Sequence, residues 1–300
     1  MQLQRDRTQS AVFLVGAARS GTSLTYKALC LHPDVAFISN WVRRAPWLPE
    51  LAVGNRLARA WPAARRATWF HGDNAYVYGD ARPLRERVFP MPVEGEPVFE
   101  RFGFRQDGAQ HGSPDLDGLR RSFRRLALAA GGRTVVSKRI AHNWRITQLA
   151  AALPTARFVS ITRDGRAVAY SLSRVDWWPD SVVPWYGDTP RGWAREGRDP
   201  WELCARNWVE EVRAVERGLA ALTPGRVLSI SYEQLVADPV TTLSTIAEFA
   251  GLGVDTDWVD DVARLRFPDR NERWRTQLEP DVVDRITGIQ QADLRTYAYM

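Results

Sequence analysis

The sequence of 300 residues predicts an α/β protein in which a central parallel sheet of about five strands lies between two layers of helices. Short apolar segments alternate along the chain with segments of helical periodicity. This alternation is typical of βαβ units, and a glycine-containing turn joins the first strand to the first helix. Strands that are joined by such crossovers form a parallel sheet that helices cover on both faces.

The strands and helices follow one another in an order that builds crossover connections. The predicted strands are residues 12–15, 35–38, 134–137, 157–162 and 226–232. The predicted helices are residues 21–31, 116–130, 143–152, 165–174, 200–222 and 239–250. Asp238 followed by Pro239 is a typical helix start. Ligands of such a sheet bind at the carboxyl ends of its strands.

The composition favours a single domain over residues 1–300, because the chain has no internal repeat and no long linker. No apolar run is long enough to span a membrane, and the polar start argues against a signal peptide. We therefore expect a cytoplasmic protein without stable membrane insertion. Cys30 and Cys204 lie on apolar helix faces, so we expect buried thiols.

The charge favours an anionic ligand. The net charge is +6, and the basic residues are spread along the chain without the runs that nucleic-acid patches show. We therefore expect no nucleic-acid partner. Lysine occurs only at Lys27 and Lys138, so a role that arginine cannot fill is suggested for them. The sequence does not fix the oligomeric state, and a homodimer is compatible with it.

The stretch "FLVGAARSGTS" has the outline of a phosphate-binding loop, which makes the predicted fold P-loop-like. Its candidate ligand residues are Gly16, Ala18, Arg19, Ser20, Gly21, Thr22 and Ser23. The glycines permit a tight turn whose N–H groups and following helix dipole attract an anion. The lysine of nucleotide triphosphatases is replaced by Thr22, and no carboxylate is placed for a metal ion. The sequence thus favours an anion that is bound without metal; a plain strand–turn–helix junction is the alternative.

A second candidate anion site follows the strand at 157–162. Arg163 leaves the carboxyl end of that strand, and Ser171 lies about two turns along the next helix. A ligand phosphate can join the two residues if the helix folds back beside the strand end. The alternative is a helix capped by Asp164, with Arg166 and Arg174 in solvent.

These motifs resemble those of sulfotransferases that use 3′-phosphoadenosine 5′-phosphosulfate (PAPS). "FLVGAARSGTSLTYKALCLHPDV" resembles their 5′-phosphosulfate loop, and "RFVSITRDGRAVAYSLSR" resembles their 3′-phosphate motif. "SKRIAH" is similar to a K-x-P-x-H element, with Ile140 where proline is usual. "NERWRTQLEPDVVDRI" is similar to the segment that folds over the nucleotide, which suggests Trp274 and Arg275 as nucleotide ligands. The matches run from residue 11 to about 290, with residues 41–132 the least covered, as a variable insert.

The resemblance implies in-line transfer of a sulfuryl group to a hydroxyl or amine of a small-molecule, carbohydrate or lipid acceptor. The product of the donor would be 3′-phosphoadenosine 5′-phosphate (PAP). Arg19 and Lys138 would flank the bridging oxygen and replace a metal ion. A surface role for Lys138 is the alternative.

The general base is not evident from these motifs. The usual glutamate position falls at Ser39-Asn40-Trp41, and the usual histidine position is Ile140. His142 is the candidate base, because a neutral imidazole suits proton abstraction. A structural histidine is the alternative. His71, Asp73 and Glu100 remain open, and Asn40 is a candidate ligand of the acceptor or sulfate.

The segment at about 176–208 is expected to recognise the acceptor. It holds six of the 13 tryptophans. Trp177, Trp178, Trp185 and Tyr186 lie among prolines and glycines, where they can form a lid over an acceptor or a satellite core. Two other functions compete with sulfuryl transfer: a P-loop kinase, which needs a lysine at position 22, and a non-catalytic binder of nucleotides or polyanions.

Overall fold

The central sheet has five parallel strands in the order β2-β3-β1-β4-β5. The computed structural model describes residues 10–70, 87–105 and 113–300. The strands are β1 Ser10–Val15, β2 Val35–Phe37, β3 Thr134–Lys138, β4 Arg157–Thr162 and β5 Val227–Ser231. The predicted fold class and all five predicted strands are confirmed.

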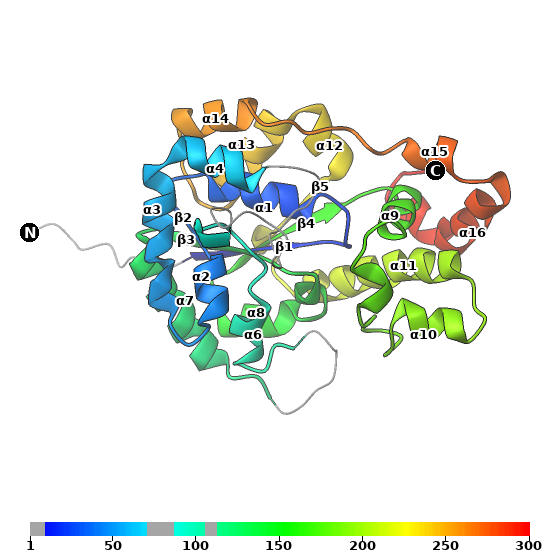
Figure 1. Ribbon diagram of the computed structural model, residues 1–300, viewed down its shortest axis with the longest axis horizontal. Helices are drawn as coiled ribbons and strands as arrows, with labels where there is room; N and C mark the ends of the chain where they lie inside the picture. The colour runs from blue at the N-terminus through cyan, green and yellow to red at the C-terminus, as the bar shows by residue number, and fades with distance from the viewer. Residues whose placement is uncertain (1–9, 71–86, 106–112) are drawn as a thin grey trace, which may run out of the picture.

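Helices cover both faces of the sheet (Figure 1). The upper layer contains α1 Thr22–Cys30, α12 Tyr232–Ala237, α13 Pro239–Phe249 and α14 Thr256–Ala263. The lower layer contains α7 Leu116–Ala130, α8 Ile146–Ala152 and α11 Pro200–Ala220. At one end, α16 Pro280–Thr296 packs against α9 Gly165–Leu172 and α11, near α10 Pro190–Arg195 and α15 Arg273–Gln277.

The region expected to be a variable insert, at about residues 41–132, contains several short helices. They are α2 Asn40–Arg44, α3 Gly54–Ala60, α4 Pro62–Trp69 and α6 Glu96–Glu100, with a 3-10 turn at Pro49–Val53. Trp69 at the end of α4 is buried, and its indole Nε1 donates to the Pro90 carbonyl at 3.0 Å. Further 3-10 turns lie at Ile140–Trp144, Trp178–Asp180 and Pro224–Arg226. The helix predicted at 143–152 therefore begins later, at Ile146.

Local signals explain the helix ends. Asp115 caps α7 by accepting from the Gly118 N–H at 2.7 Å, and Gly131 ends this helix with φ 69°. Asp238 caps α13 in the same way, with Pro239 as its first residue. Both cysteines are buried free thiols, as predicted.

The topology determines where a ligand can bind. β1 lies at the centre of the sheet, with β3 on one side and β4 on the other, so the strand order reverses there. The connections that leave β1 and β4 therefore separate and open a crevice at their carboxyl ends. In the described part of the chain, no helix has the length and apolar composition to cross a membrane.

Candidate active site

The loop between β1 and α1 is held in a conformation that two of its glycines make possible. Gly16 has φ 144° and Gly21 has φ 87°. A Cβ atom on Gly16 would lie 2.2 Å from the Ile161 carbonyl oxygen, and one on Gly21 would lie 2.8 Å from the Tyr232 ring. Arg19 also has a positive φ, of 70°, which is uncommon for a residue with a side chain. The backbone is thus constrained into a tight loop that ends at the N-terminus of α1.

A buried side chain outside the predicted motifs fastens this loop. Asn143 accepts from the Gly16 N–H at 2.9 Å and donates to the Gly16 carbonyl at 3.0 Å. Its amide nitrogen also donates to Glu211 on α11. Burial raises the pKa of Glu211 to about 7, while the hydrogen bond from Asn143 acts in the opposite direction. No sequence signal marks Glu211, because its partner is remote along the chain.

The two predicted anion motifs are in direct contact. The Arg163 guanidinium donates to the Arg19 carbonyl at 2.8 Å, and Arg19 Nε donates to Ser171 Oγ at 3.0 Å. Arg163 also stacks on Tyr232, with Cζ 4.1 Å from the ring centroid. Helix α9 therefore does fold back beside the strand end, which brings Ser171 to the loop.

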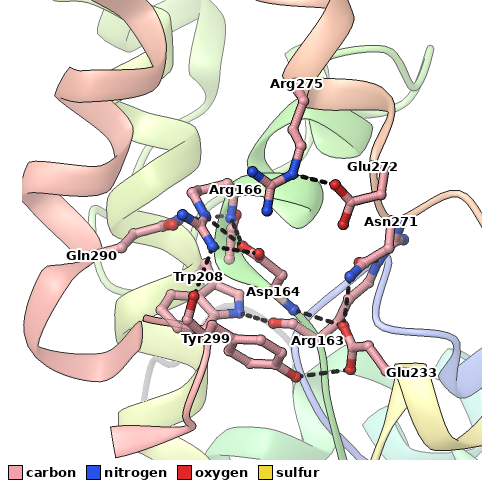
Figure 2. A network of polar contacts seen from close by, with 11 residues as sticks. Arg163, Asp164, Arg166, Trp208, Glu233, Asn271, Glu272, Arg275, Gln290 and Tyr299 are labelled. Atoms are coloured by element: carbon pink, nitrogen blue, oxygen red, sulfur yellow. Dashed lines mark hydrogen bonds and ion pairs between the residues drawn. The ribbon is translucent and has the colours of Figure 1, made fainter. Parts of the chain in front are cut away.

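A polar network fixes the junction of β4 and α9 (Figure 2). Glu233 accepts from the Asn271 amide at 2.9 Å and from the Tyr299 hydroxyl at 3.0 Å. Asn271 in turn accepts from Arg163 Nε at 3.1 Å. The C-terminal part of the chain thus positions Arg163.

One arginine in this network differs from the expectation. Arg166 pairs with Asp164 at 2.7 Å, donates to the Tyr299 carbonyl and lies over the Trp274 ring, as Figure 2 shows in part. The expectation that Arg166 lies in solvent is therefore wrong. Asp164 does cap α9, as the alternative interpretation of this segment predicted. The helix cap and the contact between the two anion motifs are therefore both present.

A basic cavity of about 650 Å³ opens where the two motifs meet. Gly21, Thr22, Ser23, Ser171 and Tyr232 line it. Its cationic lining residues are Arg19, Lys27, Arg66, Arg163, Arg264, Arg266 and Arg270. A nucleotide-sized ligand fits a cavity of this volume, and the excess of cations favours an anionic one.

The C-terminal contribution to this cavity comes from an earlier segment than expected. Trp274 is 3% exposed and packs against Ala167 and Tyr170, while Arg275 is exposed and pairs with Glu272. Neither residue lines the cavity, whereas residues 264–266, 268 and 270 do. The basic sequence "RLRFPDR" before Asn271 is the signal that could have indicated this segment.

Lys138 ends β3 and is paired with a carboxylate from the insert. Its Nζ lies 2.5 Å from Glu94 Oε1, and its side chain is 5% exposed. The sheet register places Lys138 beside Leu14, two residues before the loop glycine Gly16. Lys138 is not among the residues that line the basic cavity. Sequence reasoning missed Glu94, which lies in the poorly matched region.

The neighbouring residues form a second ion pair of the same kind. Arg139 pairs with Glu96, and its guanidinium carbon Cζ lies 4.4 Å from the centroid of the Phe99 ring. Two consecutive basic residues of "SKRIAH" thus meet two acids separated by Gly95. A Cβ on Gly95 would lie 2.6 Å from Ile38 Cγ2, so the segment packs closely against the end of β2.

The structure places His142 in the core instead of at the rim. Its side chain is fully buried, its ring lies edge-on to Phe13 and Phe99, and its Nε2 contacts Ser137 Oγ at 3.0 Å. Burial lowers the pKa of His142 well below its usual range, and the charges of Arg139 and Lys138 act in the same direction. This environment is that of a structural histidine, the alternative given above, so we do not propose His142 as the general base.

Asn40 is likewise engaged by the protein. Its amide donates to the Arg87 and Phe89 carbonyls and accepts from the Met91 N–H at 3.1 Å. The expected contact with acceptor or sulfate is replaced by a structural role, in which Asn40 holds the segment that leads to Glu94. Of the residues left open, Glu100 is exposed. His71 and Asp73 lie outside the described residues.

The tryptophan-rich segment forms a second hydrophobic cluster next to the loop. Trp178 is buried with Trp193, Leu172 and loop residue Ala18, and Trp185 and Tyr186 pack on the cluster. Trp185 Nε1 donates to Asn207 at 3.2 Å. Trp178, Trp185 and Tyr186 therefore belong to a small satellite core, the alternative to a lid over the acceptor. Trp177 is 44% exposed, and its contact with an acceptor stays a prediction.

The similarity of the chain to known proteins agrees with the geometry. A model of the sulfotransferase family matches residues 11–256. The chain belongs to the sulfotransferase family. Membership of this family gives the phosphate-binding outline of the loop and the contact between the two motifs a common explanation.

Individual relatives are distant. The omega-hydroxy-beta-dihydromenaquinone-9 sulfotransferases Stf3 of Mycobacterium bovis and Mycobacterium tuberculosis are each 24% identical over 264 residues. That alignment covers 81% of this chain and 63% of the relative, so the chain spans under two thirds of these curated relatives.

Solved sulfotransferases share the fold. The STF9 structure from Mycobacterium avium superposes with a TM-score of 0.57 at 15% identity, over 96% of this chain and 77% of that chain. The sulfotransferase domain of the curacin biosynthetic pathway superposes with a TM-score of 0.52 at 14% identity, over 93% of this chain and 96% of that domain.

Two features of the loop fit an anionic donor. Ser20 Oγ is fully buried and has no hydrogen-bond partner among the described residues, so a bound oxyanion would satisfy it. The N-terminus of α1 contributes unpaired N–H groups at the same place. The described ranges contain no group of three metal-binding side chains; metal independence itself stays a prediction.

Proposed function

We propose that this sulfotransferase takes its sulfuryl group from PAPS and transfers it to a hydroxyl or amine of a small molecule, carbohydrate or lipid. The observation that carries the proposal is the direct contact of Arg163, Arg19 and Ser171 at one basic cavity. An adenosine donor with phosphate groups at both ends needs two anion sites that share a cavity. The loop and the Arg163–Ser171 pair supply them.

The roles of the residues follow from their places. The N–H groups of residues 21–23 and the hydroxyls of Ser20, Thr22 and Ser23 would bind the 5′ end, while Arg163 and Ser171 would bind the 3′-phosphate. Bound PAPS supplies a sulfuryl group on a phosphate leaving group. Arg19 and Lys138 would stabilise the negative charge that develops on the bridging oxygen, the role that a metal ion has in kinases.

The acceptor class is inferred from the name of a relative and from the apolar cluster beside the loop. The Stf3 relatives carry in their name a hydroxylated menaquinone, an apolar molecule with an alcohol group. The aromatic cluster beside the loop of this chain is apolar too, which favours a hydrophobic acceptor. A screen with sulfur-labelled PAPS and fractionated metabolite and lipid extracts would identify the molecule that is labelled.

Nucleotide binding provides the first test. We expect PAP to raise the melting temperature far more than AMP, because AMP lacks the 3′-phosphate. Ser171→Ala should weaken PAP binding about 10- to 150-fold, the equivalent of a hydrogen bond to a charged group of about 1.5–3 kcal/mol, and leave AMP binding unchanged. Ser173→Ala is the matched control, since Ser173 Oγ donates to the Tyr170 carbonyl at the end of the same helix.

The same assay separates the competing functions. Equal shifts with PAP and AMP would contradict the donor assignment. Stronger binding of ATP with Mg²⁺ than of PAP would favour the kinase, and salt-sensitive binding of polyanions without a 3′-phosphate requirement would favour the non-catalytic binder. Turnover that persists in excess EDTA would support transfer without metal.

A further inference from the structure

We infer that Glu94 is the general base that removes the proton from the acceptor; this inference rests on the proposed function. The Glu94 carboxylate lies 2.5 Å from the Lys138 ammonium and is 17% exposed, whereas Lys138 is 5% exposed. A carboxylate that is both accessible and bonded to the lysine at the end of β3 is positioned for proton transfer beside that lysine.

The fold holds Glu94 there through backbone contacts. The Val93 N–H donates to the Ile38 carbonyl at 3.0 Å, and the Asn40 N–H donates to the Met91 carbonyl at 3.0 Å. The Tyr26 hydroxyl of α1 donates to the Val93 carbonyl at 3.3 Å. The segment therefore runs antiparallel along the continuation of β2 and is tied to α1, the helix that begins at the anion-binding loop.

In-line transfer explains why a base at this position can reach the acceptor. The attacking and leaving oxygens lie on opposite sides of one sulfur atom, so a lysine at the leaving oxygen is also near the acceptor oxygen. The carboxylate bonded to that lysine lies within the same small volume. His142, the base that the sequence suggested, is fully buried in the core.

The step is balanced in atoms and charge. Glu94 takes the proton of the acceptor hydroxyl as the acceptor oxygen forms a bond to sulfur. The bond between sulfur and the bridging oxygen breaks, and its electron pair stays on the nucleotide phosphate, beside Lys138. The products are the sulfate ester, PAP and a proton that Glu94 later releases to water. Lys138 exchanges its bond to Glu94 for one to the phosphate, which frees the carboxylate to act.

A purely structural ion pair is the competing explanation, and the protein contains its own comparison. Arg139 and Glu96 form the neighbouring ion pair from the same two segments, with the Arg139 side chain buried and the Glu96 side chain 26% exposed. Glu94→Gln and Glu96→Gln both replace a carboxylate by an isosteric amide that still accepts a hydrogen bond. A structural role predicts similar effects of the two substitutions, whereas a base predicts different ones.

The first experiment measures PAP release from PAPS with phenol, with 4-nitrophenol and with water as the acceptors. We expect Glu94→Gln to lower kcat/KM with phenol about 10²- to 10⁴-fold, the usual contribution of a general base. With 4-nitrophenol at about pH 9 the acceptor is already ionised, so the loss should be less than about tenfold. Glu96→Gln should retain wild-type turnover with every acceptor.

The second experiment needs no acceptor. Because the chain has two lysines, selective ¹³C labelling of lysine gives two side-chain signals, and Lys138→Arg identifies that of Lys138. Glu94→Gln should shift this signal, and Glu96→Gln should leave it in place. Addition of PAP should move the wild-type Lys138 signal, as the ammonium turns from Glu94 to the nucleotide.

The outcomes separate this inference from the proposed function. A Glu94→Gln protein that binds PAP and releases it at the wild-type rate with phenol would overturn the assignment of Glu94. An equal loss with phenol and ionised 4-nitrophenol would also overturn it, since Glu94 would then only position Lys138. A wild-type protein that binds PAP no better than AMP would instead contradict the proposed donor. A wild-type protein that binds PAP but releases none with any acceptor would refute the catalytic roles of both Glu94 and Lys138.

Discussion

Asn143 is predicted to couple the stability of the protein to nucleotide binding. Its amide makes two hydrogen bonds to the backbone of Gly16 and a third to Glu211, all of them buried. Asn143→Ala removes these bonds and leaves the Gly16 N–H, the Gly16 carbonyl and a buried carboxyl without this partner. The free energy of unfolding should fall by about 3–9 kcal/mol, since each of the three unsatisfied buried groups costs about 1–3 kcal/mol.

The chain contains a matched control for this substitution. Asn55 accepts from the Phe37 N–H at 2.8 Å and donates to the Phe37 carbonyl at 3.3 Å, the same double contact at the end of β2. It is fully buried, as Asn143 is. Asn55→Ala should cost about 2–6 kcal/mol, because the two backbone bonds are lost but no buried carboxyl is left behind.

Urea unfolding and PAP titration together test the reasoning. Both variants should unfold at lower urea concentrations than the wild type, and only Asn143→Ala should also weaken PAP binding, by about tenfold or more, because the loop at Gly16 loses its fixed conformation. Equal PAP affinities in the two variants would refute the claim that Asn143 organises the anion site.

Three further predictions concern the buried ionisable groups and Lys138. Because the folded-state pKa of Glu211 is raised to about 7, its protonated form stabilises the fold, and that stability, on the order of 3 kcal/mol, should be lost as the pH rises from about 4.5 to 7. Glu211→Gln should flatten the dependence of urea midpoints on pH in this window. An unchanged slope would mean that other groups cause the pH dependence. Lys138→Ala should lower kcat about 10²- to 10³-fold and leave PAP affinity within about threefold, as steady-state kinetics and titration calorimetry would show; wild-type turnover would remove Lys138 from the mechanism. His142→Gln should lower the melting temperature but leave the pH profile of turnover unchanged, and a displaced profile would restore His142 as the base.

The local parts of the site were accessible from sequence because each depends on neighbouring residues. The glycines at 16 and 21, the strand before them and the helix after them specify an anion loop within a dozen positions. Arg163 and Ser171 were found for the same reason. The sequence required the helix to fold back beside the strand end, and the hydrogen bond from Arg19 to Ser171 shows that it does.

The expected roles that the structure does not support share one cause. His142 and Asn40 are polar residues near the motifs, and sequence reasoning gave them catalytic or binding roles because it could not see their burial. Trp274 was assigned to the nucleotide because the motif contains it, but it packs beneath Arg166. Glu94 was overlooked because nothing distinguishes its acidic side chain until Lys138 is seen beside it.

The sequence alone determined the order of buried strands, the parallel sheet and the two anion motifs, because hydrophobic periodicity and glycine turns act over a few residues. Only the tertiary structure decided which polar side chains meet. Glu94 meets Lys138 across 44 positions, and Asn143 meets Gly16 across 127. Such contacts arise from the packing of the whole chain around one sheet, so no local pattern of residues predicts them.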